Sequence, residues 1–503
     1  HFADRRCWVT EAEHAAARVL SDSESSPCLS TLYYAPVWKN SDIVISDITP
    51  EDTFAVFDTT AYKNGYYNKY NIHEKMVWIL DDQSDPASGV YFLLKFIREV
   101  MATIPGKSVT MIYAYQGGDL DLGACYHRAV SGFMKTVMTE NSKYVLKTIE
   151  FENISEKNFV NEKLTEEFLV DAPHMEIRYK NRQRYVKCYD EQKAKSNLSE
   201  SRLKKNGTYI ITGGMGGLGM IMAKHLASKF NAHIVLSGRS AFTPGKEAKI
   251  SLLNNSGGTA LYIKADISNI DEAEYLIEET RSKFGKINGI IHAAGVLRDS
   301  LILNKTDEDM KAVCSPKIYG TIHLERAAKE QQLDFLVFFT SGAAVLPISG
   351  QCDYAYANSF MDNFAIYRNK LVQKGERFGR TLSINWPLWK KGGMSVDENT
   401  EKMLASLMGI HSLPSKDGLH ATAFPSGISG VPAEVIEQLS PVVVRERSIR
   451  ADSGGAGKVR GGCGQTLKLS VRTARPYSFS GLFDRLQHPA RGVQFFLPSG
   501  QNM

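Results

Sequence analysis

The chain has 503 residues, of which 43% are hydrophobic and 23% are charged, and its formal net charge is +5. These values are typical of a globular protein with two or more domains and give no support for a nucleic-acid partner. No apolar stretch reaches the length of a membrane span and no signal peptide opens the chain, so we expect no membrane partner. Seven singly spaced cysteines without metal-ligand spacing predict reduced thiols, a cytoplasmic location and no metal site. His1 in place of an initiating methionine predicts a piece of a longer polypeptide.

The first 200 residues predict a linker followed by an α/β domain. Residues 1–31 contain an Ala/Glu-rich run and then a Ser-rich run, which is typical of an interdomain linker. Residues 32–200 alternate between strand and helix patterns. The expected elements are strands over 76–80, 108–115 and 144–150 and helices over 90–101 and 129–139. This block has no glycine fingerprint and no cluster of catalytic residue types, so we expect a structural domain that binds no cofactor.

A glycine cluster opens the second block, residues 201–422. The apolar run Tyr209–Ile211 leads into it, and apolar residues at helical spacing follow from Met220 to Phe230. Strand, glycine turn and helix together form the context that a dinucleotide fingerprint requires, because glycines let the backbone approach a pyrophosphate and the helix N-terminus attracts it. The residues predicted to bind the cofactor here are Thr212, Gly213, Gly216, Gly217, Leu218 and Gly219. A plain turn is the alternative interpretation.

Short strands and helices alternate through the rest of the second block. The expected elements are strands over 233–237, 260–267, 289–292 and 335–339 and helices over 271–284 and 307–330. The predicted fold class is therefore α/β. It comprises two Rossmann-like, doubly wound parallel-sheet subdomains, the first truncated and cofactor-free and the second cofactor-binding, followed by a Gly/Arg-rich tail.

Four residues downstream of the fingerprint form a candidate catalytic group. Ser341 ends a predicted strand, Tyr354 and Asn358 share one helix face, and Lys317 lies on the preceding helix. Reduction of a ketone needs a hydride at carbon, which NADPH can supply, and a proton at oxygen. Tyr354 can supply that proton if the Lys317 ammonium lowers its pKa from about 10. Ser341 would then stabilise the developing alkoxide, and Asn358 would position water or Lys317.

Each of these residues also has an ordinary structural interpretation. A serine that ends a strand is commonly a turn residue, and a tyrosine is commonly a half-buried aromatic. A lysine is commonly a solvated surface charge, and an asparagine can simply bond to its own helix. Their joint order behind a cofactor fingerprint favours the catalytic interpretation.

The motifs resemble a known family. The spacing Thr-Gly-x-x-x-Gly-x-Gly resembles the short-chain dehydrogenase/reductase superfamily. Ser341 and Tyr354 thirteen residues apart, with Asn358 after the tyrosine and the lysine at 317, resemble the ketoreductase domain of modular polyketide synthases. The resemblance covers about 32–422. Arg-Arg-Cys-Trp-Val near the start resembles the linker before such domains. Pro387, within a segment similar to the one near the nicotinamide, is a variant associated with synthases served by a separate acyltransferase.

This resemblance implies a substrate, a cofactor and partners. The substrate would be a β-ketoacyl thioester on the phosphopantetheine arm of an acyl carrier protein, and neighbouring polyketide synthase domains would be partners. Arg239 and Ser240 would grip the ribose 2′-phosphate of NADPH. Asp266 and Ile267 match the turn that contacts the adenine. Alternatively, Arg239 is an ordinary surface residue and Asp266 caps a helix.

The resemblance also implies a product configuration. In the family, a Leu-x-Asp motif such as Leu297 to Asp299 marks domains that make the D-configured β-hydroxyl. The opposite class has a tryptophan eight residues before the catalytic tyrosine, where this chain has Leu346. The alternative is that Asp299 only bonds within a surface loop, or pairs with Arg298.

The last segment, residues 423–503, differs in composition from the rest. Taken alone it could be a disordered basic extension. Its motifs resemble the C-terminal part of the hydantoinase B/oxoprolinase family, which favours a foreign join near residue 423.

Two other functional classes stay open. One is a catalytically inactive structural module, and the complete Ser/Tyr/Lys/Asn set argues against it. The other is a short-chain dehydrogenase acting on free small alcohols or ketones, and the cofactor-free first block argues against that.

Overall fold

The computed structural model describes about two thirds of the chain. The described residues are 33–43, 55–58, 75–79, 86–169, 174–192, 202–389, 412, 442–449 and 465–471. The predicted linker 1–31 and the tail motifs at 452–464 and 488–492 lie outside them. The chain forms two compact units, one of residues 1–395 with 412–426 and the other of 396–411 with 427–503. In the described ranges, none of the helices has the length and apolar character needed to cross a membrane.

A seven-stranded sheet forms the centre of the first half of the larger unit. Its strands are β1 (Tyr33–Asn40), β2 (Ala55–Asp58), β3 (Lys75–Ile79), β4 (Val109–Gln116), β5 (Tyr144–Phe151), β6 (Glu176–Lys180) and β7 (Gln183–Gln192). Its helices are α3 (Pro86–Thr103), α4 (Leu122–Glu140) and α5 (Lys157–Leu169). The strand order is β1-β7-β6-β5-β4-β3-β2. Every strand and helix expected between 76 and 150 is present, and α5 was not predicted because its buried residues form only a narrow stripe.

The first sheet has the predicted parallel strands and, in addition, two antiparallel pairings at one edge. Strands β2 to β6 pair in parallel, whereas β7 pairs antiparallel with both β6 and β1. Asn181 and Arg182 join β6 to β7 with φ angles of 50° and 61°. Two successive left-handed residues make the tight turn of a β-hairpin, so the strands that they join must run antiparallel.

A six-stranded parallel sheet forms the centre of the second half. Its strands are β8 (Thr208–Thr212), β9 (His233–Gly238), β10 (Thr259–Lys264), β11 (Gly289–His292), β12 (Phe335–Ser341) and β13 (Arg380–Trp386). All neighbours pair in parallel, in the order β10-β9-β8-β11-β12-β13. The order reverses between β8 and β11, and ligands of such sheets bind where the carboxyl ends of the strands meet that reversal.

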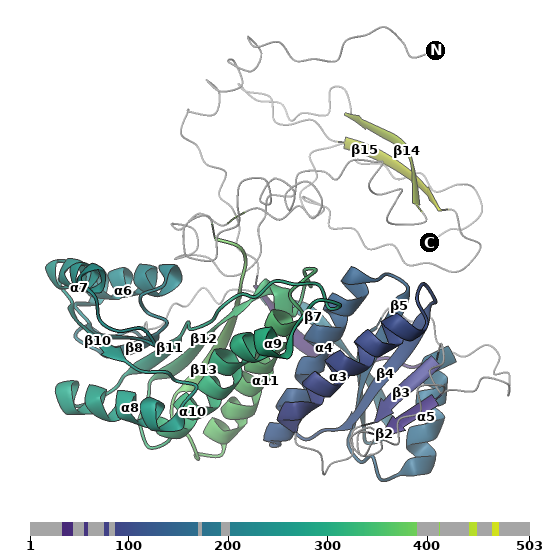
Figure 1. The fold of residues 1–503 in the computed structure, drawn as a ribbon, viewed down its shortest axis with the longest axis horizontal. Helices are drawn as coiled ribbons and strands as arrows, with labels where there is room; N and C mark the ends of the chain where they lie inside the picture. The colour runs from purple at the N-terminus through teal and green to yellow at the C-terminus, as the bar shows by residue number, and fades with distance from the viewer. Residues whose placement is uncertain are drawn as a thin grey trace, which may run out of the picture. The chain divides into compact units, whose positions relative to one another are not determined.

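Helices cover both faces of the second sheet. They are α6 (Gly217–Phe230), α7 (Pro244–Asn255), α8 (Ile270–Phe284), α9 (Asp307–Cys314), α10 (Gly320–Ala327) and α11 (Cys352–Gln373). Helices α6 and α7 lie on one face, and α8 and α10 on the other (Figure 1). The continuous helix expected over 307–330 is instead interrupted by a π-helical turn, Ser315–Tyr319. Pro316 lacks the N–H for an ordinary helical bond, and the N–H of Gly320 donates to the carbonyl of Ser315.

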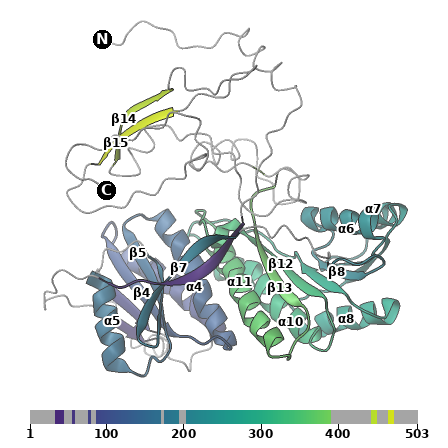
Figure 2. The same cartoon turned by 180° about the vertical axis from the view of Figure 1, so that it is seen from behind.

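The two halves of this unit pack together along α4 and α11. The two helices lie side by side between the sheets (Figure 1 and Figure 2), and one hydrophobic cluster contains buried residues of both. The rings of Tyr126 and Phe360 are 4.7 Å apart across this seam. Gly132 lets the helices approach closely, because a Cβ there would lie 2.6 Å from the carbonyl oxygen of Ala355. Ala355 directly follows Tyr354, so the seam reaches the predicted catalytic residues.

The smaller unit contains an antiparallel pair of strands, β14 (Val442–Ile449) and β15 (Gln465–Val471). The register of the pair shifts between Val444 and Glu446. Such a shift bends a strand and increases its local twist.

We predict that Gly132→Ala destabilises the protein. The added methyl has no space against Ala355, so the helices must separate, and we expect the free energy of unfolding to fall by about 1–3 kcal/mol. Gly245→Ala is the matched control: nothing lies within 4 Å of its would-be Cβ, so we expect no loss of stability. Denaturant unfolding measures both, and equal effects of the two substitutions would contradict close packing at Gly132.

Candidate active site

The fingerprint glycines lie at the point where the strand order of the second sheet reverses. Gly213 has a φ of 66°, and a Cβ there would lie 2.7 Å from Cα of Ala294, which follows β11. Only glycine tolerates both the left-handed backbone and this close approach. A Cβ at Gly219 would lie 2.7 Å from Cα of Gly214, so the first turn of α6 packs directly on the glycine turn. The predicted fingerprint therefore has the tight backbone that a dinucleotide site requires.

The N-terminus of α6 is free to bind an anion. Its N-cap, Gly216, makes no side-chain capping bond. The first-turn N–H groups, those of Gly217, Leu218 and Gly219, have no partner within the helix. Helix N–H groups without a cap, together with the positive end of the helix dipole, fit a pyrophosphate.

The end of β9 presents a cation and a hydroxyl. Arg239 is exposed and makes no ion pair with any described carboxylate. Ser240 is exposed as well, and its Oγ lies 2.7 Å from Nζ of Lys246, which also donates to the Ser240 carbonyl at 2.8 Å. The hydroxyl of Tyr262 donates to that carbonyl at 2.6 Å. Lys246 and Tyr262, which sequence reasoning missed, thus hold the loop that carries Arg239 and Ser240.

Asp266 and Ile267 follow β10 at the same edge of the sheet. Oδ1 of Asp266 accepts from the N–H of Ser268 at 3.0 Å, whereas the N-cap of α8 is Asn269. Asp266 therefore closes a turn rather than capping the helix. Ile267 is buried, and its carbonyl oxygen lies 3.2 Å from Nδ1 of His323.

The four predicted catalytic residues come together, although they lie on three different elements. Tyr354 is buried in the first turn of α11, and Ser341 and Asn358 lie close enough to its side chain to influence its pKa. Nζ of Lys317, on the π-helical turn, is 5.4 Å from the centre of the Tyr354 ring and donates to the carbonyl of Phe339 at 3.1 Å. Nδ2 of Asn358 donates to the Tyr354 carbonyl at 2.7 Å, and its buried Oδ1 has no partner among the described residues.

Burial controls the charge states of this group. It raises the pKa of Tyr354 above its usual value, and the neighbouring polar side chains of Ser341 and Asn358 act in the opposite direction. It lowers the pKa of Lys317 to about 8, because the ammonium has lost its hydration. The expectation that Lys317 lowers the pKa of Tyr354 was therefore wrong for the protein without ligands. Desolvation, which the sequence does not reveal, is the largest cause of the raised pKa of Tyr354, and the Lys317 charge is not among its causes.

His292 contacts the fingerprint and lies near Lys317 of the candidate catalytic group, and sequence reasoning missed it. It ends β11 fully buried, and its Nδ1 lies 2.7 Å from Oγ1 of Thr212. Burial, with a smaller contribution from the Lys317 charge, lowers the pKa of His292 to about 3. The imidazole is therefore neutral and holds the end of β11 against the end of β8.

Asp362 is a second residue that the sequence did not single out. It lies on α11 two turns after Tyr354, and it accepts hydrogen bonds from Ser383 and, at 2.8 Å, from Nδ2 of Asn385. Asn385 also donates to the carbonyl of Ser341 at 3.2 Å. Asp362 therefore fixes the end of β12, where Ser341 lies, against β13.

The loop after β11 carries Asp299 close to Tyr354. Asp299 contributes to the electrostatic environment of the Tyr354 phenol. Its Oδ2 accepts from Nε2 of Gln351 at 2.9 Å, so its partner is Gln351 rather than Arg298. Leu346, at the position of the family tryptophan, is 44% exposed. An acidic group thus lies near the Tyr354 phenol, and the side chain at position 346 is aliphatic and open to solvent.

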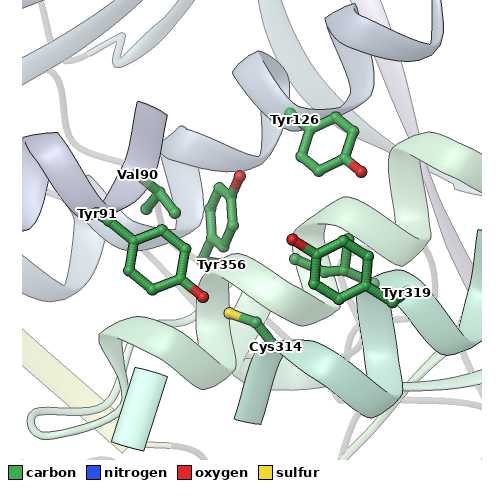
Figure 3. Close-up of a pocket in the computed structure, with 7 residues that line it drawn as sticks. Val90, Tyr91, Tyr126, Cys314, Tyr319 and Tyr356 are labelled. Atoms are coloured by element: carbon green, nitrogen blue, oxygen red, sulfur yellow. The ribbon is translucent and has the colours of Figure 1, made fainter. Parts of the chain in front are cut away.

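A small recess lies at the seam between the two halves (Figure 3). Its lining residues are Val90, Tyr91, Tyr126, Cys314, Ile318, Tyr319 and Tyr356. None of the predicted site residues lines it. Lys317 lies on the same π-helical turn as Tyr319, but its Nζ donates to the carbonyl of Phe339 on β12.

The first sheet differs at the edge that corresponds to the cofactor site of the second. The carboxylate of Glu150, on β5, accepts from Arg128 at 2.6 Å and from Arg178 at 3.0 Å. A Cβ at Gly117, directly after β4, would lie 2.3 Å from this side chain. A buried ion cluster therefore fills the carboxyl ends of β4 and β5.

Comparison with known proteins assigns a family. The KR domain model matches residues 207–391, the Beta-ketoacyl synthase-like, N-terminal model matches 80–171, and the Hydantoinase B/oxoprolinase model matches 385–494. Polyketide synthase PksN of Bacillus subtilis is 36% identical over 331 residues, which is 65% of this chain and 6% of that protein. Polyketide synthase PksL of the same organism is 36% identical over 65% of this chain. The chain thus spans only 6% and 7% of these relatives.

Two solved structures are similar to this chain over both halves of its larger unit. A ketoreductase domain from the bacillaene assembly line is 30% identical, with a TM-score of 0.67, and the match covers 77% of this chain and 92% of that one. An N-terminal ketoreductase from the macrolactin assembly line is 28% identical, with a TM-score of 0.64, over 86% of this chain and 100% of that one. The chain therefore belongs to the ketoreductase-domain family of polyketide synthases, in the superfamily of nicotinamide-dependent short-chain reductases.

The hydantoinase B/oxoprolinase match confirms the resemblance seen in the tail. It begins at residue 385, earlier than the predicted join at 423. Residues 385 and 386 belong to β13, which pairs with β12 of the second sheet. The first residues of this match are therefore part of the ketoreductase fold.

We predict that Lys317→Met stabilises the protein at pH 7. Below pH 8 the folded protein must hold a buried ammonium, and the lowered pKa implies a cost on the order of 1–3 kcal/mol that methionine removes. The cost disappears as the pH rises from about 8 to the unfolded value of 10.5, because only the unfolded chain is then protonated. Denaturant unfolding at several pH values measures the difference. The exposed Lys311→Met is the control, and a destabilised Lys317→Met at pH 7 would contradict this account.

Proposed function

We propose that the chain reduces a β-ketoacyl thioester, carried by an acyl carrier protein, to the β-hydroxyacyl thioester with NADPH. The observation that supports this proposal most directly is that Ser341, Asn358 and the buried Lys317 all lie close to the side chain of Tyr354. A phenol, a hydroxyl and an ammonium at the carboxyl end of β12 suit a carbonyl group that becomes an alkoxide. The family membership supports the same chemistry.

In this proposal NADPH, when bound at the fingerprint, supplies the hydride for the carbonyl carbon. The hydroxyl of Ser341 donates a hydrogen bond to the carbonyl oxygen and orients it. Tyr354 transfers its phenolic proton to that oxygen, which becomes the β-hydroxyl. Lys317 stabilises the resulting phenolate, and the free Oδ1 of Asn358 positions the donor that restores the proton.

The preference for NADPH rests on Arg239. Its exposed guanidinium has no described carboxylate partner, so it is available to a 2′-phosphate. Lys246 holds the neighbouring Ser240 hydroxyl and leaves its proton free to donate. An acidic residue, which would bind a free 2′-hydroxyl, is not at this position.

We predict that Arg239→Ala weakens the binding of NADPH far more than that of NADH. A charge-assisted pair with the phosphate contributes about 1.5–3 kcal/mol, so we expect the Michaelis constant for NADPH to rise by one to two decades. Initial rates with each cofactor measure this. Lys229→Ala, an exposed cation at the far end of α6, serves as the control. Equal changes for both cofactors would show that Arg239 does not contact the phosphate.

The domain organisation follows from the same proposal. Residues 32–200 form a structural subdomain without a cofactor, since the Glu150 ion cluster fills the edge where one would bind. Residues 201–422 form the catalytic subdomain, 1–31 a linker and 423–503 an attached segment that reduction does not require. The acyl carrier protein and neighbouring synthase domains are the partners.

We predict that the product has the D-configured β-hydroxyl. Asp299, held by Gln351 beside Tyr354, and the open position at Leu346 favour one direction of approach for the pantetheine arm. The hydride leaves a fixed face of the nicotinamide, so this direction determines the configuration. Chiral chromatography of the reduced thioester measures the product configuration. A predominant L-product would contradict the proposed role of Asp299 but not the proposed reduction.

Activity assays separate the proposed function from its alternatives. The 503-residue chain should oxidise NADPH when given a short β-ketoacyl thioester and react far more slowly with the corresponding free ketone. A faster reaction with the free ketone would favour a short-chain dehydrogenase of small molecules. Absence of oxidation with both, despite measurable NADPH binding, would favour an inactive structural module.

A further inference from the structure

Glu140 connects the first half of the chain to two loops beside the active site. It is the last residue of α4, in the half that carries no predicted catalytic residue. Its Oε2 accepts from the N–H of Ile302 at 2.8 Å, and its Oε1 accepts from the N–H of Gly350 at 2.8 Å. Both of these residues are buried. One carboxylate thus satisfies two buried amides, one in the loop after β11 and one in the loop before α11.

The two loops are also bonded to each other. The N–H of Ser300 donates to the carbonyl of Gly350 at 2.9 Å, and Gln351 donates to Asp299 at 2.9 Å. Gly350 has a φ of 85°, a left-handed conformation that favours glycine, and its would-be Cβ lies 3.4 Å from the nitrogen of Ser300. The loops therefore form one layer, and Glu140 holds that layer from the side of α4.

A buried ion pair connects the two loops to Tyr354. Nζ of Lys305 lies 3.0 Å from Oδ2 of Asp353, and both side chains are fully buried. The same ammonium donates to the carbonyl of Gly350 at 3.1 Å and to that of Arg298 at 2.5 Å. Oδ1 of Asp353 accepts from the N–H of Tyr354 at 2.8 Å. All donors of Lys305 are thus used, as a buried charge requires.

Other contacts between the halves near these loops are weaker. Arg98 of α3 donates to the carbonyl of Leu303 at 3.4 Å. Lys95 of α3 pairs with Asp307 at 3.1 Å, with side chains 52% and 41% exposed. Exposed pairs of this kind contribute little. Of Glu140, Arg98 and Lys95, Glu140 therefore makes the strongest polar contacts with the two loops.

We infer that Glu140 is a positioning residue for the reduction, supplied by the cofactor-free half. By holding both loops, it fixes Asp299 relative to Tyr354 and so determines the direction from which the thioester approaches. The effect of Glu140 on catalysis rests on the proposed function. Its role in holding the two loops does not depend on that function. It gives the first half a role in the selectivity of the reaction in addition to a structural one.

The test uses Glu140→Gln in the 503-residue chain. The amide side chain can accept from one loop N–H but presents its own NH₂ to the other, so one buried amide loses its partner. We expect amide hydrogen exchange to rise in peptides covering 298–306 and 346–352 and to stay unchanged in α6. We expect kcat to fall about ten- to a hundredfold and the excess of the major hydroxyl configuration to decrease, with an unchanged dissociation constant for NADPH.

Two further variants sharpen the test. Lys95→Met removes the exposed ion pair between α3 and α9 and is expected to change none of these quantities. Glu140→Asp keeps the charge but shortens the side chain. We expect it to change loop exchange, kcat and product ratio in the same directions but by less. It also serves if Glu140→Gln does not fold.

The outcomes are distinct. Increased exchange confined to the two loops, with a changed product ratio, supports the inference. Unchanged exchange and product ratio, or a uniform rise in exchange over both sheets, would overturn it, since Glu140 would then be dispensable or merely structural. If the wild-type chain does not oxidise NADPH, the proposed function fails. The exchange measurement still decides whether Glu140 holds the loops, because it needs no turnover.

Discussion

The burial of α11 is the constraint on which the rest of the structure depends. The helix packs on the second sheet and on α4, and most of its side chains are excluded from water. A buried polar group is costly unless it is hydrogen bonded, so the polar residues of α11 require partners from other elements. Asp353 forms an ion pair with Lys305, and Asp362 accepts a hydrogen bond from Asn385. Arg368 donates to the carbonyl of Gly379 at 2.7 Å. These partners hold the loop after β11, the edge strand β13 and the end of β12 in fixed positions.

The candidate active site follows from this arrangement. Tyr354 lies where α11 begins, and its partner Ser341 lies where β12 ends, so the bonds that fix α11 to β12 and β13 also fix the distance between them. The same burial that positions Lys317 removes its hydration and lowers its pKa to about 8. The lysine is therefore able to change its charge near neutral pH, which suits a group that assists proton transfer. The close approach of α4 at Gly132 makes the first half part of this environment.

The sequence predicted those features that depend on local backbone or on fixed spacing. The fingerprint was predicted because Gly213 needs a left-handed backbone and close contact, and because strand, turn and helix follow one another directly. Ser341, Tyr354 and Asn358 were predicted from their spacing and from the family resemblance. The partners of Glu140 could not be predicted, because they lie 162 and 210 residues away and only the tertiary fold brings them together. The direction of the Tyr354 pKa shift was wrong for a related reason, since burial depends on packing. The π-helical turn was missed because periodicity alone does not locate a single wide turn at Pro316.

The central claim is that Tyr354 gives its proton to the substrate oxygen while NADPH occupies the fingerprint site. Single-turnover oxidation of NADPH by the full chain with a short β-ketoacyl thioester, compared between wild type and Tyr354→Phe, tests it most directly. Phenylalanine keeps the ring that packs in α11 and removes only the acidic hydroxyl. The account predicts a rate lower by about 10²–10⁴-fold and an unchanged dissociation constant for NADPH. Turnover of Tyr354→Phe at a rate near that of the wild type would contradict it.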